Sequence, residues 1–355
     1  MDLWTLVSFV VGLVLLVFGA EWLVRGASRL AAAAGISPLV VGLTIVAFGT
    51  CAPELAVSVA SAWRGQADMA VGNVVGSNIF NVLFIVGLAA AITPLVVAQD
   101  LVRRDVPLVI GVSFVALFLA FDGRIGRLDA LLLAGGLVAY TGWLVVASRR
   151  ERTVAAEFEA EYGQKVATPW WRSVLLVVVG LALLVLGSQW LVDAAVTFAR
   201  WLGIGEVVVG LTIVAAGTSL PELATSVMAA LRGERDIAVG NVVGSNAFNL
   251  MGVLGVSGLL APDGLAVTPS MVQLDFPVMI AAAVGCLPIY ARGATIPRWQ
   301  GIVFVGGYVA YTTYLVLDAT RHEATSGYAS VMLRFVLPIL AVTLVVLALR
   351  ARRPK

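Results

Sequence analysis

Long apolar stretches alternate with short polar segments along the chain, a pattern that predicts a bundle of membrane-spanning helices. Glycine, proline and polar residues interrupt the second and third stretches, so we interpret both as broken helices. The same order of stretches repeats after a polar connection, and an unpaired eleventh stretch follows. The predicted spans are 3–25 with a continuation to 35, 38–63, 69–96, 106–121, 128–147, 174–200, 207–231, 237–260, 276–291, 299–317 and 331–349.

Two forty-residue windows indicate that the chain is a duplication. Residues 42–81 and 210–249, aligned at a constant offset of 168, agree at 29 positions. Each copy of the duplicated unit holds five predicted helices. Because five is odd, the second copy enters the membrane from the opposite side, and we expect inverted repeats. The predicted divisions are a first five-helix repeat at 1–147, a cytoplasmic linker at 148–172, a second repeat at 173–317, and a loop, an extra helix and a basic tail at 318–355.

The composition is that of a membrane protein, because 60% of the residues are hydrophobic and only 12% are charged. We therefore expect one all-α polytopic membrane domain. A net charge of +2 with scattered basic residues argues against a nucleic-acid partner. Cys51 and Cys286 lie in apolar surroundings and predict neither a disulfide framework nor a thiolate metal site, and His322 lies in a polar loop. The N-terminal stretch lacks the features of a signal peptide and predicts a retained helix.

Basic residues are distributed unequally between the two sides of the predicted bundle. With the N-terminus outside, 17 of the 23 lysine and arginine residues fall on the cytoplasmic side, with the linker and the C-terminus. Cytoplasmic loops of membrane proteins carry such an excess. This arrangement needs the eleventh helix, because a ten-helix chain would leave the basic tail outside.

Each copy of the motif places a carboxylate, Glu54 or Glu222, inside an apolar stretch beside proline and glycine. Such a residue is costly in lipid unless it serves an ion or substrate, and a helix break at this point frees backbone carbonyls. The predicted donors are the carbonyls of Ala47 and Thr50, the side chains of Glu54 and Ser58, and a polar helix face with Asn73, Ser77 and Asn81. The second copy offers Ala215, Thr218, Glu222, Ser226, Asn241, Ser245 and Asn249.

All of these donors are oxygens or amides, a set that favours hard cations such as Ca²⁺ or Na⁺ over Zn²⁺ or copper. Ca²⁺ takes about 6 to 8 oxygens, and two bidentate carboxylates with one carbonyl from each break supply about six. Several Na⁺ ions could share the same oxygens, so competition for ligands would couple the two ions. A single membrane Glu can also be a structural hydrogen-bond donor, but two matched Glu residues with matched polar neighbours favour an ion site.

Glu21 has a different setting from the two motif carboxylates. It lies near a helix end beside Arg25, and its counterpart in the second copy is Gln189. We therefore interpret Glu21 as part of an interfacial ion pair and not as an ion ligand.

The paired motifs, GTCAPE with GNVVGSNIFN and GTSLPE with GNVVGSNAFN, resemble the two alpha-repeats of the sodium/calcium exchanger family, in particular its prokaryotic members. The resemblance extends over nearly the whole chain. It implies antiport of Ca²⁺ out against Na⁺ in, by alternating access, in a prokaryotic inner membrane. It also implies that Ca²⁺ and Na⁺ are the transported substrates and that no cofactor is involved.

Residue by residue, the resemblance implies a central Ca²⁺ position held by the two glutamates, with flanking Na⁺ sites. Two departures from the family pattern concern this site: both final motif positions are amides, and Cys51 stands where Ser219 stands in the other copy. The linker holds no Ca²⁺-binding module, and the eleventh span exceeds the ten-helix family core. The implied ligands are Glu54 and Glu222 at the centre, completed by Asn81 and Asn249, with Ala47, Thr50 and Ser77 on one side and Ala215, Thr218 and Ser245 on the other.

Three other functions fit parts of the pattern. A calcium/proton antiporter would use the same fold, because the buried carboxylates could carry protons. A cation channel could also use the interrupted helices. An intramembrane hydrolase is disfavoured because no pair of nucleophile and base stands out near either Glu, and we expect no enzymatic activity.

Overall fold

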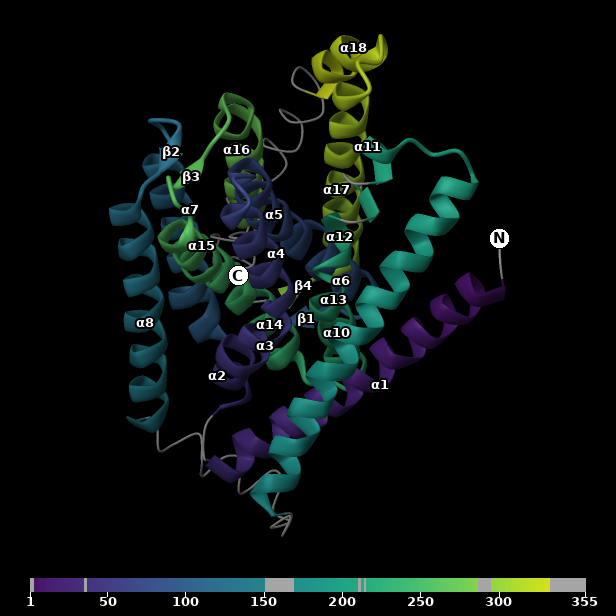
Figure 1. Ribbon diagram of the computed structural model, residues 1–355. Helices are drawn as coiled ribbons and strands as arrows, with labels where there is room; N and C mark the ends of the chain where they lie inside the picture. The colour runs from purple at the N-terminus through teal and green to yellow at the C-terminus, as the bar shows by residue number, and fades with distance from the viewer. Residues whose placement is uncertain are drawn as a thin grey trace, which may run out of the picture.

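The structure is a computed structural model, and its described part is almost entirely helical (Figure 1). Six helices are long and apolar enough to cross a membrane, and a seventh is formed if one bent pair is counted as a span. These findings confirm an all-α polytopic membrane protein. The described residues are 3–34, 37–150, 169–209, 212–213, 215–286 and 295–332.

The first half begins with one long helix and ends with another, and the shorter helices between them include π-helical segments. Its helices are α1 (Leu3–Ala34), α2 (Pro38–Val41), η1 (Gly42–Val46), α3 (Ala47–Thr50), α4 (Ala52–Trp63), α5 (Ala67–Ile79), η2 (Phe80–Val86), α6 (Gly87–Ile92), η3 (Leu101–Asp105), α7 (Val106–Leu119) and α8 (Arg127–Arg150). Its two short strands are β1 (Leu95–Val96) and β2 (Arg124–Ile125).

The second half repeats this order. Its elements are α10 (Trp170–Trp201), α11 (Glu206–Val209), α12 (Ala215–Gly217), α13 (Leu220–Leu231), α14 (Arg235–Phe248), η5 (Asn249–Val253), α15 (Leu254–Leu260), β3 (Leu265–Ala266), η6 (Met271–Asp275), α16 (Phe276–Gly285), β4 (Thr295–Ile296), α17 (Arg298–Ala319) and α18 (Ala324–Val331). Of the predicted eleventh span only residues 331 and 332 are described, and most of the predicted linker also lies outside the described residues.

The second predicted helix is broken as expected. The segments Pro38–Thr50 and Ala52–Trp63 meet at an angle of 45°. Pro53 stands in the first turn of α4 and has no backbone N–H to continue the hydrogen-bond ladder, which accounts for the break.

The third predicted helix is not broken, and this expectation was wrong. Residues Ala67–Ile92 form one continuous helix, as do Arg235–Leu260 in the second half. The ladder changes to π-helical bonding at η2 and η5 instead of opening, since no proline interrupts either segment. Single π-helical turns inside α-helices are frequent at functional sites.

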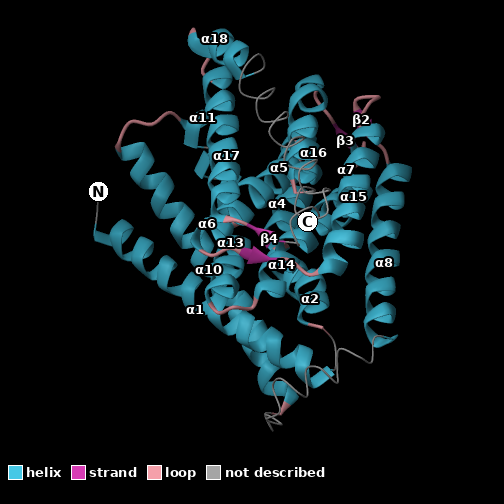
Figure 2. Ribbon diagram, turned by 180° about the vertical axis from the view of Figure 1, so that it is seen from behind, coloured by secondary structure: helices cyan, strands magenta, loops and turns pink. Residues whose placement is uncertain are grey.

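The longest helices, α1 and α10, pack side by side and lie at an angle across one side of the bundle (Figures 1 and 2). Glycines let their backbones approach closely: a Cβ added at Gly19 would lie 2.8 Å from the carbonyl oxygen of Gly180. A Cβ at Gly12 would meet the carbonyl oxygen of Gly187 at 2.9 Å. Small residues at a helix contact are the usual basis of close packing in membranes.

Short strands connect the two halves reciprocally. β1 pairs with β4, and β2 pairs with β3, both antiparallel. In the aligned halves, β1 is the counterpart of β3, and β2 is the counterpart of β4. The β1–β4 pair is therefore the symmetric counterpart of the β2–β3 pair. This exchange is consistent with inverted repeats related by an approximate twofold axis.

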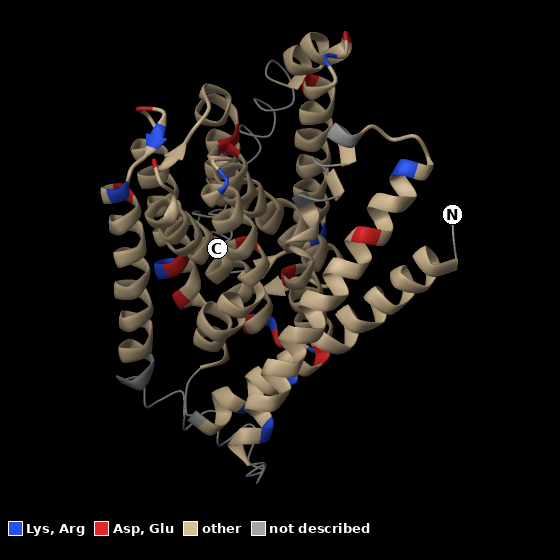
Figure 3. Ribbon diagram, viewed as in Figure 1, with Lys and Arg blue, Asp and Glu red and all other residues tan. Residues whose placement is uncertain are grey.

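The continuous helices Ala67–Ile92 and Arg235–Leu260 lie at the centre of the bundle. In their most apolar windows 67% and 94% of the residues are buried, against 28% in α1 and 6% in α17. Charged positions are isolated on an otherwise uncharged ribbon (Figure 3). The polar faces predicted for the site therefore belong to the most enclosed helices.

Candidate functional site

Glu54 and Glu222 occupy equivalent positions in the first turns of α4 and α13. Both side chains are fully buried, and they are close enough to interact electrostatically. The first turn of a helix presents unpaired backbone N–H groups and a positive dipole end, which favours a carboxylate. The structure thus brings the two predicted carboxylates together between the halves and away from solvent.

A hydroxyl from the second half binds the carboxylate of the first. Ser219 precedes α13 and donates a hydrogen bond from Oγ to Oε1 of Glu54 at 2.8 Å. In the first half the matching position is Cys51, whose Sγ lies 3.8 Å from the carbonyl oxygen of Ser245. The two helix breaks therefore face each other, and the Ser219 hydroxyl of one break contacts the glutamate of the other.

Asn241 connects the break of the first half to the second half. It accepts a hydrogen bond from the Thr50 hydroxyl at 3.2 Å through Oδ1. Its Nδ2 donates to the Ser226 hydroxyl at 3.0 Å and to the carbonyl oxygen of Glu222 at 3.4 Å. One buried amide thus joins Thr50 of one repeat to the site helix of the other.

Asn73 makes the reciprocal connection. Its Oδ1 accepts from the Thr218 hydroxyl at 3.4 Å. Its Nδ2 donates to the Ser58 hydroxyl at 2.9 Å and to the carbonyl oxygen of Glu54 at 3.2 Å. Because both connections cross between repeats, each helix break is positioned by a helix of the other half.

The remaining predicted side chains of the two central helices are also buried at the site. Ser77, Ser245, Asn81 and Asn249 are each at most 1% exposed. Asn81 donates from Nδ2 to Oδ1 of Asn246 at 3.0 Å, a further contact between repeats. Asn81 lies at the start of η2 and Asn249 begins η5, so the π-helical turns lie beside the site.

The structure gives hydrogen-bond partners for one of the predicted carbonyl donors, Ala47, and less for its counterpart, Ala215. The carbonyl oxygen of Ala47 accepts from the backbone N–H of Cys51 at 3.0 Å and from the Thr50 hydroxyl at 3.3 Å, so it is already engaged. Ala215 begins α12, and its side chain is outside the described part. The carbonyl part of the predicted ligand set stays a prediction.

Buried polar atoms without a hydrogen-bond partner gather at this site. Almost all buried polar groups in folded proteins are hydrogen-bonded, and each exception needs an explanation. A cation coordinated by oxygen atoms would explain the oxygen atoms among them. Among the described residues they include Glu54 Oε2, Glu222 Oε1 and Oε2, Ser77 Oγ, Ser245 Oγ, Asn81 Oδ1 and both amide atoms of Asn249.

Sequence reasoning missed two features of this region. Asn73 and Asn241 were placed on the polar faces, but their partners in the opposite repeat were not foreseen. A second symmetric set was also missed: the Tyr140 hydroxyl donates to Asp105 at 2.7 Å, and the Tyr311 hydroxyl donates to Asp275 at 2.7 Å. Equivalent spacing in the two halves was the available signal for both features.

The fold and the site define a class: a duplicated transmembrane protein whose buried polar centre, between the two repeats, is rich in oxygen atoms suited to a cation. Comparison with known proteins gives the family. The profile described as sodium/calcium exchanger protein matches residues 4–146 and 172–317, and the chain belongs to this family. The match ends before the predicted eleventh span.

Several relatives are similar over nearly their whole length. The chain is 40% identical to the putative antiporter CaxA of Alkalimonas amylolytica over 315 residues, covering 87% of this chain and 97% of that protein. It is 37% identical to the inner membrane protein YrbG of Escherichia coli over 318 residues, covering 86% and 95%. It is 34% identical to the sodium/calcium exchanger MaX1 of Methanosarcina acetivorans over 338 residues, covering 86% and 96%.

A solved structure has the same fold. The sodium-calcium exchanger NCX_Mj, soaked with zero Na⁺ and Ca²⁺, superimposes with a TM-score of 0.76 at 29% sequence identity. The match covers 89% of this chain and all of the other chain. Sequence and structure therefore agree on the family.

Proposed function

We propose that the protein exports Ca²⁺ in exchange for Na⁺, with Glu54 and Glu222 as the shared ligands of a site that opens alternately to the two sides of the membrane. The observation that carries this proposal is the pair of fully buried glutamates with unpartnered carboxylate oxygens. No ion pair between either carboxylate and a basic side chain occurs among the described residues. Two buried carboxylates without a basic partner need a bound cation to balance their charge.

The donor set favours Ca²⁺ over softer or smaller divalent ions. Two carboxylates match the charge of one Ca²⁺, and hydroxyl and amide oxygens complete its preferred shell of about 6 to 8 oxygens. Magnesium keeps its water more strongly and fits such a dehydrated site less well. The same oxygens, divided among several Na⁺ ions, would make the two cations compete for one set of ligands.

The relatives support this assignment. MaX1 and NCX_Mj are named as sodium/calcium exchangers, and both cover most of this chain. The paired carboxylates of the two alpha-repeats are also the positions at which the family resemblance places the central ion. Ala47, Thr50, Ser77 and Asn81, with Ala215, Thr218, Ser245 and Asn249, are the proposed surrounding ligands.

In the proposed cycle the chain's own residues hold the ion and link the halves. The Glu54 and Glu222 carboxylates bind the cation, and the Ser219 hydroxyl orients the first of them. Asn73 and Asn241 keep each helix break in register with the opposite repeat. Inverted repeats that move about such a central site would expose it to one side at a time.

The proposed orientation follows from the distribution of basic residues, with the N-terminus outside and the linker and C-terminus in the cytoplasm. A prokaryotic inner membrane is the proposed location, in accord with the name of the relative from Escherichia coli. Arg232, at the end of α13, is then cytoplasmic, and Arg64, at the end of α4, is external.

The test is uptake of ⁴⁵Ca²⁺ into proteoliposomes that hold the purified full-length protein. An outward Na⁺ gradient should drive Ca²⁺ accumulation, whereas K⁺ and proton gradients of equal size should not. Downhill Ca²⁺ influx that needs no counter-ion would indicate a channel and would contradict the proposal.

A proton-coupled exchanger is the second candidate. It is favoured by Glu222, whose two carboxylate oxygens are buried without a hydrogen-bond donor. A proton bound at either oxygen would leave this buried carboxyl group uncharged, so a proton could take the place of Na⁺ in the exchange. Ca²⁺ accumulation driven by a pH gradient in the absence of Na⁺ would establish this alternative.

A further inference from the structure

The two site helices differ in what covers them. On α13 the residues Leu220, Ala224 and Met228 pack against a cluster of buried residues contributed mainly by α1. These three residues are partly buried. The cytoplasmic half of the proposed pathway is therefore covered by the long tilted helix.

The equivalent residues on α4 are Ala52, Ala56 and Ala60, and all three are exposed. Ala56 and Ala60 line a wide, shallow cavity at the surface, which extends along α4 from Leu55 to Arg64. α4 packs instead against α5 and α15. The two symmetric faces thus differ in exposure: the face of α13 is covered by α1, and the equivalent face of α4 is exposed.

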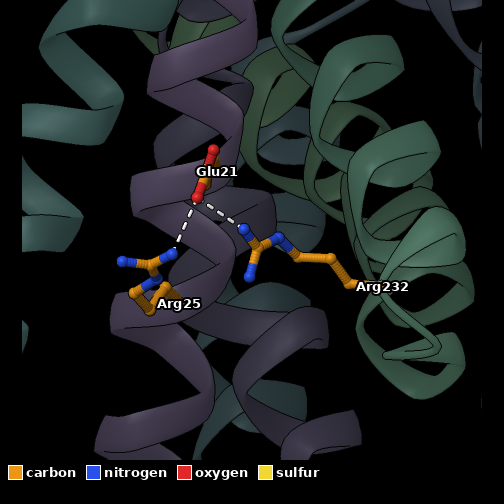
Figure 4. A network of polar contacts seen from close by, with 3 residues as sticks. All are labelled: Glu21, Arg25 and Arg232. Carbon is orange, nitrogen blue, oxygen red and sulfur yellow. Dashed lines mark hydrogen bonds and ion pairs between the residues drawn. The ribbon is translucent and has the colours of Figure 1, made fainter.

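An ion-pair network holds the covered side together (Figure 4). Glu21, on α1, accepts a hydrogen bond through Oε1 from Nη2 of Arg25 one turn later, at 2.7 Å. The same oxygen accepts from Nη2 of Arg232, which caps the C-terminal end of α13. The network therefore ties α1 to the far end of the helix that begins beside Glu222.

The symmetric positions on the open side do not form this tie in the described part of the chain. Gln189 stands on α10 where Glu21 stands on α1, and it carries no charge. Arg64 stands at the end of α4 where Arg232 ends α13, and no ion pair of Arg64 occurs in the described part of the chain. Asp193 occupies the place of Arg25, so the charge there is reversed.

We propose that the ion pair between Glu21 and Arg232 is a latch that keeps α1 against α13 and biases the protein toward the conformation with the α4 side open. The inference rests on alternating access in the proposed function. An inverted repeat exchanges the environments of α4 and α13 when it changes state. Glu21 has no acidic counterpart on α10, so the two sides offer different ion pairs and the two states are unequal in free energy.

The expected size of the bias is modest because the pair is partly exposed. Pairs of this kind shift an equilibrium about two- to fivefold. Salt screens exposed charges, so the bias should shrink at high ionic strength. Choline chloride is the suitable salt, because it varies ionic strength without adding a cation that the protein is proposed to transport.

Two matched pairs of spin labels can measure the equilibrium in the full-length protein. One pair replaces Phe18 on α1 and Leu231 on α13, and the other replaces their equivalents, Leu186 on α10 and Trp63 on α4. All four side chains are exposed, at 49%, 61%, 47% and 68%. The labels are attached to cysteines introduced at these positions. The same distance measurement on the protein without introduced cysteines gives the background signal from labelling of Cys51 and Cys286.

The variant Glu21→Gln copies the residue found at the symmetric position. It should raise the ratio of open to closed α1–α13 distances about two- to fivefold and shift the α10–α4 pair in the opposite direction. Arg232→Gln should do the same. The double exchange Glu21→Arg with Arg232→Glu should restore the original ratio, since it re-forms the pair.

Gln189→Glu is the control on the other side. It gives Arg64 a carboxylate partner and should shift both distance ratios toward the state in which α4 is covered. Unchanged distance distributions in both Glu21→Gln and Arg232→Gln would overturn the latch, whichever of the two is better folded.

The distance measurement is independent of the ions transported. If Glu21→Gln shifts the distances while no variant exchanges Ca²⁺ for Na⁺, the latch stands and the proposed function fails. If exchange is normal and the distances do not respond, the latch fails and the proposed function stands.

Discussion

The two copies of the duplicated motif share most of their residues, but their site helices α4 and α13 have different neighbours. Glu54 on α4 receives a hydrogen bond of 2.8 Å from the Ser219 hydroxyl, whereas the equivalent position beside Glu222 on α13 holds the thiol of Cys51. α13 is covered by α1, and α4 lines an open cavity. Duplication thus gives both repeats nearly the same polar residues. Packing and a few substitutions then give α4 and α13 different surroundings in this conformation.

The largest expected effect comes from removing either charge at the centre. Glu54→Gln and Glu222→Gln keep the shape of the side chain and lose its charge. Even residues that only orient metal ligands cost 10- to 100-fold when mutated, so loss of a ligand should lower Na⁺-driven ⁴⁵Ca²⁺ uptake about 100-fold or more. Glu323→Gln, in an exposed turn, is the control and should transport normally.

The next effect concerns the two asparagines that connect the repeats. Asn241→Ala and Asn73→Ala each leave buried hydrogen-bonding groups unpaired, at a cost of about 1–3 kcal/mol in free energy of unfolding. Asn241 is fully buried and Asn73 only partly, so Asn241→Ala should lower the thermal denaturation midpoint more. Equal midpoints in wild type and Asn241→Ala would show that this amide does not join the halves.

A third pair of variants tests the unequal support of the two carboxylates. Ser219→Ala removes the donor to Glu54 and should weaken apparent Ca²⁺ affinity about tenfold, as expected for a group that orients a ligand. Cys51→Ser places a hydroxyl at the equivalent position near Glu222 and should strengthen affinity a few fold, about the worth of one hydrogen bond. Titration of Ca²⁺-dependent uptake measures both, and effects of the same sign would contradict the comparison.

The smallest effect is expected on the open face. Ala60→Met copies the residue at the covered position and points into the cavity, so stability should change by less than about 0.5 kcal/mol. Met228→Ala removes packed atoms beneath α1 and should cost about 1–2 kcal/mol, less than for a fully buried methionine. Thermal denaturation of the two variants in one detergent compares the faces directly, and a cost for Ala60→Met as large as that for Met228→Ala would show that α4 is also covered.

The sequence predicted the features of this fold that depend on residues close together along the chain. Apolar length predicted a bundle of membrane-spanning helices, and Pro53 predicted the break in the second helix. The two motif carboxylates, Glu54 and Glu222, are both buried and interact electrostatically, while their joint role as ion ligands stays a prediction. The ion pair of Glu21 with Arg25 was also predicted and is confirmed, because the two residues are one helical turn apart. The predicted place near a helix end was wrong, since α1 continues to Ala34 and Glu21 lies within it.

What the sequence did not predict depends on contacts between distant segments. Arg232 joins Glu21 from the other half of the chain, and Asn241 receives the Thr50 hydroxyl from the opposite repeat. The continuous third helix was missed because Gly76 and Ser77 were interpreted as a break, although glycine and serine leave the backbone N–H in place and the ladder continues through a π-helical turn. Two nearly identical motifs do not show whether α4 or α13 will be covered, since the covering helices, α1 and α10, lie outside the motifs.

The most direct test of the central claim is equilibrium binding of ⁴⁵Ca²⁺ to the purified protein, with Na⁺ as competitor. A site shared by two carboxylates predicts that wild type binds Ca²⁺, that Na⁺ displaces it, and that Glu54→Gln and Glu222→Gln each abolish binding although both variants elute as folded protein. Undiminished Ca²⁺ binding in either variant would contradict the claim that the two glutamates form one site.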